Sequence, residues 1–239
     1  MKKLLHAISL ILLTLALFSC DGRRIKGSGH VSTANQKLGN YNKIEVKGSM
    51  DVYFTQGPEQ DAVIEADDNI LPYIELVQED DKLIIRQKNH ISLSYHNEIK
   101  IRLQAPNVKS FALSGSGNIK LINTVENQES VWLGVSGSGN VEGVVDAPEV
   151  NANISGSGDI TVSGQTRDLE LNIAGSGNFN GKSLMAENAN INIAGSGDAE
   201  VHASVKLEGK IVGSGDIDYL GNPQVSSKVM GSGEIRKKD

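Results

Sequence analysis

The chain has 239 residues, of which 38% are hydrophobic and 22% charged, with a formal net charge of −6 and an isoelectric point near 5.4. A net negative charge argues against nucleic acid as a partner, because phosphate binding needs a basic surface. The single cysteine, Cys20, excludes an intramolecular disulfide.

The beginning of the chain has the pattern of a secretory signal peptide, predicted for residues 1–19. Two lysines precede an apolar run over residues 4–18, which is too short and wrongly flanked for a stable membrane span. Cys20 follows this run at the point where a bacterial lipobox places the cysteine that becomes lipidated. We therefore predict a lipid anchor on Cys20 and a lipidated tether over residues 20–37. Ordinary secretion with a free cysteine is the alternative.

Residues 38–112 alternate like strands but lack a strict repeat. We expect strands, a helical turn and a hairpin here, at Lys43–Lys47, Asp51–Thr55, Ala62–Ala66, Asn69–Ile74 (the turn), Ile74–Val77 with Lys82–Arg86 (the hairpin) and Glu98–Leu103. Gly27-Ser28-Gly29 and Gly48-Ser49-Met50 resemble diverged copies of the corners described next. The region is predicted to form expanded coils or a β-rich cap, because repeat arrays need atypical ends.

From residue 113 to 239 the tripeptide Gly-Ser-Gly recurs seven times at intervals of 18 to 22 residues. An aliphatic residue stands two positions before each copy, a polar residue directly after it and an apolar residue one step further. Self-similarity at this period is typical of a solenoid whose coils stack on one another. The predicted structural corners are Gly115, Gly117, Gly137, Gly139, Gly156, Gly158, Gly175, Gly177, Gly195, Gly197, Gly213, Gly215, Gly231 and Gly233.

One repeat shows how a coil is built. Leu169, Leu171 and Ile173 alternate with polar or small residues, the period of two expected of a strand with one buried face. Glycine then turns the chain and permits close approach of neighbouring backbones. A coil of this length has room for roughly three short sides of about five residues. We predict an all-β, parallel β-helix and treat residues 38–235 as one continuous domain.

Several ordered motifs together resemble one protein family, the putative auto-transporter adhesin, head GIN domain family. They are Gly39–Val46, Asp51–Gly57, Asn69–Ile74 and the Gly-Ser-Gly-Asn/Asp series, and the resemblance covers roughly residues 38–235. It implies a β-helical, secreted or lipid-anchored protein of gram-negative bacteria and an adhesive role, and it brings no established catalytic residues. A true autotransporter also needs a C-terminal membrane barrel; no such strands follow the last corner, so we do not expect self-translocation.

Catalysis is one possibility, because parallel β-helices often host polysaccharide lyases and hydrolases. Asp159, Asp198 and Asp216 occupy equivalent corners, with Asn178 between the first two, and stacking would place them about 4.8 Å apart per coil. Corner residues that satisfy turn backbone are the simpler interpretation. The histidines at positions 30, 90, 96 and 202 are scattered and form neither a triad nor a metal motif.

Calcium is a second candidate ligand for the corners. It usually takes six to eight oxygen ligands, whereas each corner supplies one carboxylate or a neutral amide. We therefore predict no catalytic residue, metal or cofactor.

A binding role remains. Trp132 lies between Val131 and Leu133, so alternation places its side chain on the outer face. There it is either a contact point for a ligand or, more commonly for such a residue, packed under a neighbouring loop. Outward asparagines form a polar wall that suits broad weak contacts or self-association and equally suits solubility alone, at Asn151, Asn153, Asn172, Asn190 and Asn192. The predicted function is a non-enzymatic, adhesin-like lipoprotein, held in the outer membrane of a gram-negative bacterium by its N-terminal lipid, that presents its flank to a glycan or protein. A homo-oligomer is compatible with this function, and strong self-association without an external ligand would indicate a scaffold. A polysaccharide-active enzyme and a structural envelope scaffold are the alternatives.

Overall fold

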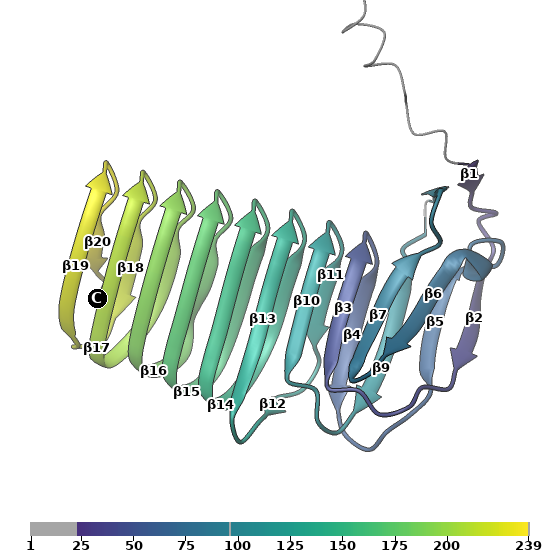
Figure 1. Cartoon of the computed structure of the whole chain (residues 1–239), viewed down its shortest axis with the longest axis horizontal. Helices are drawn as coiled ribbons and strands as arrows, with labels where there is room; N and C mark the ends of the chain where they lie inside the picture. The colour runs from purple at the N-terminus through teal and green to yellow at the C-terminus, as the bar shows by residue number, and fades with distance from the viewer. Residues whose placement is uncertain (1–22, 96, 239) are drawn as a thin grey trace, which may run out of the picture.

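The computed structural model describes residues 23–95 and 97–238, and its coils stack along the long axis of the molecule (Figure 1). An 18-stranded sheet runs through the molecule, joined by a two-stranded sheet at one end. Its neighbouring coils pair in parallel, which confirms the predicted β-helix. No helix in this described part of the chain is long and apolar enough to cross a membrane.

The regular coils share one register. Their strands are β10 (Ser110–Gly115), β11 (Asn118–Leu121), β12 (Val125–Glu126), β13 (Ser130–Gly137), β14 (Asn140–Gly156), β15 (Asp159–Gly175), β16 (Phe179–Gly195), β17 (Ala199–Gly213), β18 (Ile217–Leu220), β19 (Gln224–Gly231) and β20 (Ile235–Lys237). Corner glycines stack on corner glycines, for example Gly137 on Gly156 and Gly156 on Gly175.

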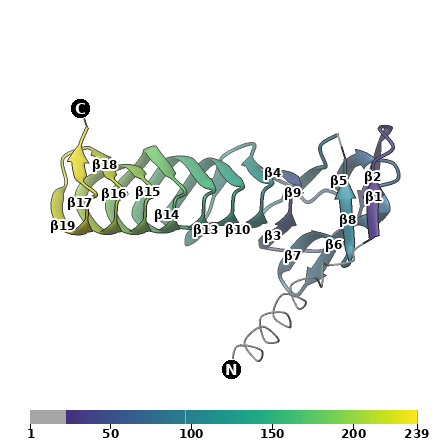
Figure 2. The ribbon, with the colours of Figure 1, turned by 90° about the horizontal axis from the view of Figure 1, so that it is seen from above.

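The short sides of a coil are joined into one continuous strand. β14, β15 and β16 each contain 17 residues, because the parallel ladder continues through the bends between sides. Each strand therefore wraps around the core (Figure 2).

The core consists of the aliphatic rows that the alternation predicts. Leu169, Leu171 and Ile173 are at most 2% exposed, and their equivalents in the neighbouring coils are buried beside them. A slip of one residue would turn a whole row to solvent, so this pattern fixes the register of stacking.

The N-terminal end is closed by a cap. β3 (Lys43–Gly48) and β4 (Asp51–Gln56) form a coil under β10 and β11, and β7 (Lys82–Gln87) and β9 (Lys100–Ala105) pair with them from the other side. Three further strands then pair antiparallel: β6 (Ile74–Glu79) on β7, and β5 (Ala62–Asp67) between β9 and β2 (Val31–Gln36). The predicted hairpin and helical turn are confirmed by β6–β7 and by η1 (Leu71–Tyr73).

One of the two diverged corners is confirmed and the other is wrong. Gly48 pairs with Gly115 in the next coil. The backbone N–H of Gly27 instead donates to the carbonyl oxygen of Ser94 at 2.8 Å, beside the small sheet of β1 (Arg23–Lys26) and β8 (Ile91–Ser94). Gly27 therefore belongs to the cap rather than to a coil.

The tether predicted for residues 20–37 is too long, because β1 and β2 within it pair with other strands. Unpaired backbone gains hydrogen bonds by joining these sheets. The signal peptide predicted for residues 1–19 and the lipid anchor predicted on Cys20 lie outside the described residues.

Candidate functional site

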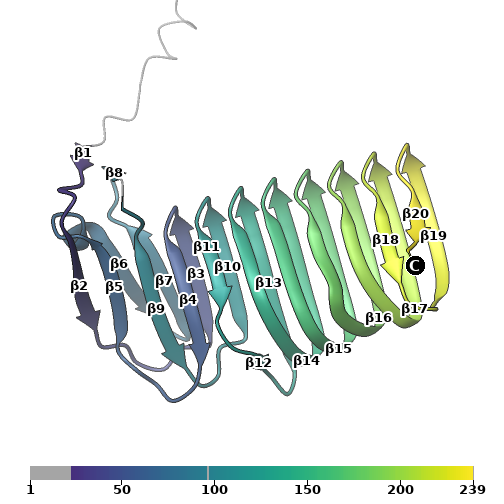
Figure 3. The ribbon, with the colours of Figure 1, turned by 180° about the vertical axis from the view of Figure 1, so that it is seen from behind.

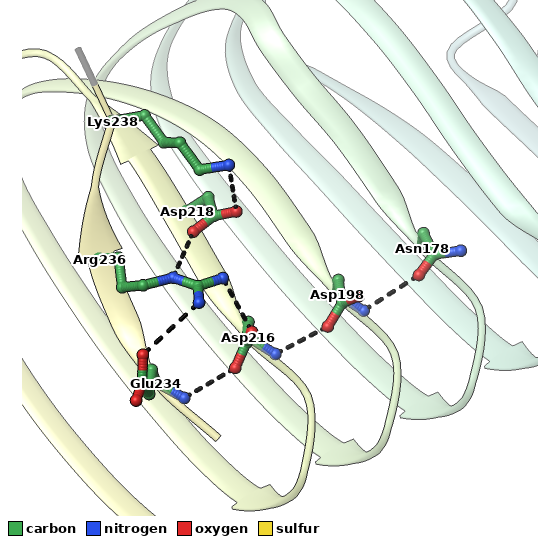
Figure 4. Close-up of polar contacts among 7 residues, drawn as sticks. All are labelled: Asn178, Asp198, Asp216, Asp218, Glu234, Arg236 and Lys238. Carbon is green, nitrogen blue, oxygen red and sulfur yellow. Dashed lines mark hydrogen bonds and ion pairs between the residues drawn. The ribbon is translucent and has the colours of Figure 1, made fainter. Parts of the chain in front are cut away.

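The polar residues that follow the corners form a ladder along one edge of the solenoid (Figure 4). The backbone N–H of Asn178 donates to Oδ1 of Asp159 at 2.8 Å. In the same way Asp198 donates to Asn178 at 3.2 Å, and Asp216 donates to Asp198 at 2.8 Å. Each side chain thus satisfies a backbone donor of the next coil, which is the structural role expected of these corner residues.

The ladder ends on a cluster of cations. The guanidinium of Arg236 contacts Oδ2 of Asp216 at 2.8 Å and Oδ1 of Asp218 at 3.0 Å, and Lys238 lies 3.0 Å from Oδ2 of Asp218 (Figure 4). Burial raises the pKa of Asp218, but hydrogen bonds from Lys238 and Arg236 outweigh it and hold the pKa below its ordinary value. A general acid at neutral pH needs the opposite shift. Asp218 therefore stays ionised as a structural partner of the cations.

Metal binding has little support among the residues described. No group of three or more His, Cys, Asp or Glu side chains there is arranged to hold a metal ion. His30, His90 and His202, which the structure describes, do not join the corner ladder.

A groove of about 520 Å³ lies on the outer face of β10 and β13–β17. Its base is a row of residues in register, one from each coil: Ala112, Gly134, Asn153, Asn172, Asn192 and Lys210. Five steps of about 4.8 Å make this row about 24 Å long. Small side chains one row closer to the corners, Ala174 and Ala194 among them, keep the groove open and largely apolar.

Trp132 lies at one end of this groove. It points outward between the buried Val131 and Leu133, as the alternation predicts, and it is half-buried. A Cβ atom at Gly134 would collide with the six-membered ring of the indole. The absence of a side chain at Gly134 therefore lets the ring lie against the sheet, where it stays in the groove lining.

An amide ladder follows along the base of the groove. Nδ2 of Asn172 donates to Oδ1 of Asn153 at 3.3 Å, and Nδ2 of Asn192 donates to Oδ1 of Asn172 at 3.2 Å. A carboxamide carries two N–H donors and two acceptor lone pairs, so this ladder leaves hydrogen-bonding capacity for a ligand. Lys210 adds an ammonium group at the far end.

Sequence reasoning placed Trp132 and the asparagines outward but missed the groove. The missed residues are Ala112, Gly134 and Lys210. Their place in the repeat could have identified them, because all six residues of the groove base stand three residues before the first glycine of a corner. Asn151 and Asn190 belong to the neighbouring row of Trp132 and bond to Glu149 and Glu170 instead.

Comparison with known proteins agrees with the fold. Residues 40–223 match the family described as putative auto-transporter adhesin, head GIN domain. A structure described as a putative lipid binding protein from Parabacteroides distasonis ATCC 8503 is 28% identical, with a TM-score of 0.77, and the match covers 91% of this chain and 100% of that one. A putative adhesin from Bacteroides fragilis NCTC 9343 is 24% identical, with a TM-score of 0.83, over 90% and 100% of the two chains. No curated protein matches.

Proposed function

Because this chain belongs to the putative auto-transporter adhesin, head GIN domain family, we propose that it is a binding protein of the cell envelope that holds a glycan in the Trp132 groove. The family match confirms the resemblance found in the sequence and indicates a cell-surface or exported protein. We place the lipid anchor on Cys20 and the protein in the outer membrane of a gram-negative bacterium, on the strength of the signal peptide and lipobox patterns.

The groove carries the proposal. The C–H face of a sugar ring is apolar and packs on a flat aromatic side chain such as Trp132. Sugar hydroxyls donate and accept hydrogen bonds, which matches the amides of Asn153 and Asn172. The ammonium of Lys210, about 19 Å from the tryptophan along four coils, favours a chain with an acidic group. The groove length suits an oligosaccharide rather than a single sugar.

A lipid is the second candidate, for two reasons. The small residues Ala112, Ala174 and Ala194 make much of the lining apolar, and one structural neighbour is described as a putative lipid binding protein. An acyl chain along the groove, with an acidic headgroup near Lys210, would use the same surface.

Binding is tested on a protein of residues 21–239, which contains every described strand. Neutral and acidic oligosaccharides are titrated by calorimetry, with vesicles of anionic lipid as a separate arm. We expect Trp132→Ala to weaken glycan binding about tenfold or more, as for a central aromatic contact. Asn172→Ala should weaken it less, and Lys182→Ala, on an exposed position outside the groove, serves as control. Glycan binding that survives Trp132→Ala and Asn172→Ala would refute the proposed site.

Catalysis is tested on the same glycans by following new reducing ends and unsaturated products. We expect no turnover, since the corner carboxylates Asp198 and Asp216 hold backbone amides of neighbouring coils. Turnover that disappears in Asp198→Asn would favour the enzyme alternative.

Location is tested by protease treatment of intact cells. Loss of the protein places it on the surface, whereas protection until the outer membrane is opened would favour the scaffold alternative.

A further inference from the structure

The end of the solenoid opposite the cap has an unpaired edge. β19 pairs with β17 and β20 pairs with β18 on one side only, and no strand of the described residues covers their outer edges. All eight residues of β19 are exposed. The cap end differs in strand direction, because its outermost strands, β2 and β6, pair antiparallel with β5 and β7.

Apolar residues of the core row are uncovered at this edge. Val225 and Val229 pair in register with Leu207 and Ile211, which are fully buried. Val225 and Val229 themselves are 39% and 40% exposed. An exposed strand edge with apolar side chains is a template for pairing with another strand.

We propose that this edge pairs with the same edge of a second copy, so that two solenoids join end to end through antiparallel β19 strands. A contact between identical surfaces closes on itself with twofold symmetry. Joining the open end of one copy to the cap end of the next is disfavoured, because the antiparallel strands of the cap do not continue the parallel coil. The arrangement is therefore a closed pair rather than a filament.

The sequence of β19 selects one register. Placing Ser227 opposite Ser227 of the partner copy keeps both core rows inward and sets each Val225 opposite a Val229. It also sets Lys228 opposite Ser226. Sliding the strands by two residues one way brings Lys228 opposite Lys228, a repulsive pair; sliding them the other way places Val229 beyond the partner strand. A slide of one residue turns the valines to the opposite face.

The pairing edge lies far from the start of the fold. β1 and β20 are at opposite ends of the long axis (Figures 1 and 3). In a pair, the two N-terminal ends therefore point away from each other. With the lipid anchor proposed above, such a pair would connect copies held on two facing membranes.

The test measures the mass of residues 21–239 by light scattering at increasing concentration. We expect the mass of two copies, and we expect Ser227→Lys to weaken pairing roughly a hundredfold, because two unpaired charges would face one another at the contact. Ser183→Lys, at an exposed serine on the flank, should leave the pair intact. Ser227 is exposed in the single copy, so circular dichroism should show Ser227→Lys folded.

A cross-link tests the register directly. Ser227→Cys should form a reducible dimer on oxidation, because directly opposite residues bring Cβ atoms within about 4.5–5.5 Å, whereas Ser183→Cys should not. The tested protein has no other cysteine. A single copy at every concentration, a pair that withstands Ser227→Lys, or equal cross-linking through Ser183→Cys would each overturn the proposal.

Discussion

Two glycines, Gly158 in a corner and Gly29 in the cap, are needed for different reasons, and this gives a quantitative prediction. A Cβ atom at Gly158 would collide with the carbonyl oxygen of Gly139 and lie 2.6 Å from Cγ1 of Val135. A Cβ atom at Gly29 would meet nothing within 4 Å, although its φ of +81° is unfavourable for alanine. Gly158→Ala therefore tests the close approach of coils, and Gly29→Ala tests backbone conformation alone.

The expected costs differ severalfold. In Gly29→Ala the left-handed conformation costs about 1–2 kcal/mol, partly offset by about 0.4–1 kcal/mol from a less flexible unfolded chain. Gly158→Ala must separate two backbones. Overpacking costs about 1–3 kcal/mol, and two weakened hydrogen bonds, from Gly158 to Gly137 (3.0 Å) and from Asp159 to Gly139 (3.3 Å), add about 1 kcal/mol each. With the same offset from the unfolded chain applied to both, we expect about 2–4.6 kcal/mol for Gly158→Ala and about 0–1.6 kcal/mol for Gly29→Ala.

Urea unfolding followed by circular dichroism measures both variants against the parent protein of residues 21–239. The free energy of unfolding is extrapolated to water, and the slope with urea shows whether cooperativity is kept. A Gly158→Ala variant no less stable than Gly29→Ala would refute the reasoning that backbone contact between coils requires these glycines.

Three further predictions concern single side chains. Burial raises the pKa of Tyr41 to about 12, so the stability that the protonated phenol contributes is complete below about pH 10 and is lost as the pH rises toward 12. An absorbance titration should show one tyrosine that ionises only near this pH, and Tyr41→Phe should abolish that step. Arg236 helps to lower the pKa of Asp218 despite burial, so the ion pair stabilises the fold at pH 7, where Asp218 is ionised, and less at pH 3. Arg236→Ala should therefore lower the urea midpoint more at pH 7 than at pH 3, and an equal decrease of the midpoint at both pH values would contradict the ion pair. Gly134→Val should displace Trp132, the single tryptophan, and shift its fluorescence to the red; an unchanged spectrum would contradict the packing.

The regular coils were predictable because their partners are local. Each residue pairs with one about 18 to 22 positions away, so the distance in sequence between equivalent residues, such as Gly156 and Gly175, gives the strand register. The cap sequence has no repeat from which the pairing can be predicted. Residues 57–105 fold back to the far side of β3, and Gly48 therefore pairs with Gly115, 67 residues later. Long-range antiparallel pairs such as β2 on β5 depend on packing that no repeat encodes, and this is why the tether boundary was wrong.

The groove was predictable only in part. Alternation places Trp132 and Asn172 outward, which the structure confirms. Their alignment in one groove depends on the stacking of coils and on Gly134, whose contribution is a missing side chain. A residue such as Gly134 contributes only the space that its missing side chain leaves for Trp132. Such a role can be recognised only when the positions of the neighbouring coils are known.

The corner ladder also bears on what the open end can accept. In the inner coils the residue after the corner is Asn or Asp, and from Asn140 onward its Oδ1 accepts from the next backbone N–H, as Asp216 does for Glu234 at 2.9 Å. The last described corner instead carries Glu234, one methylene longer, whose carboxylate lies 3.5 Å from the guanidinium of Arg236. Glu234 therefore does not offer the acceptor that Asp216 offers to Glu234. Antiparallel pairing through β19 does not involve the corner, so it needs no such acceptor.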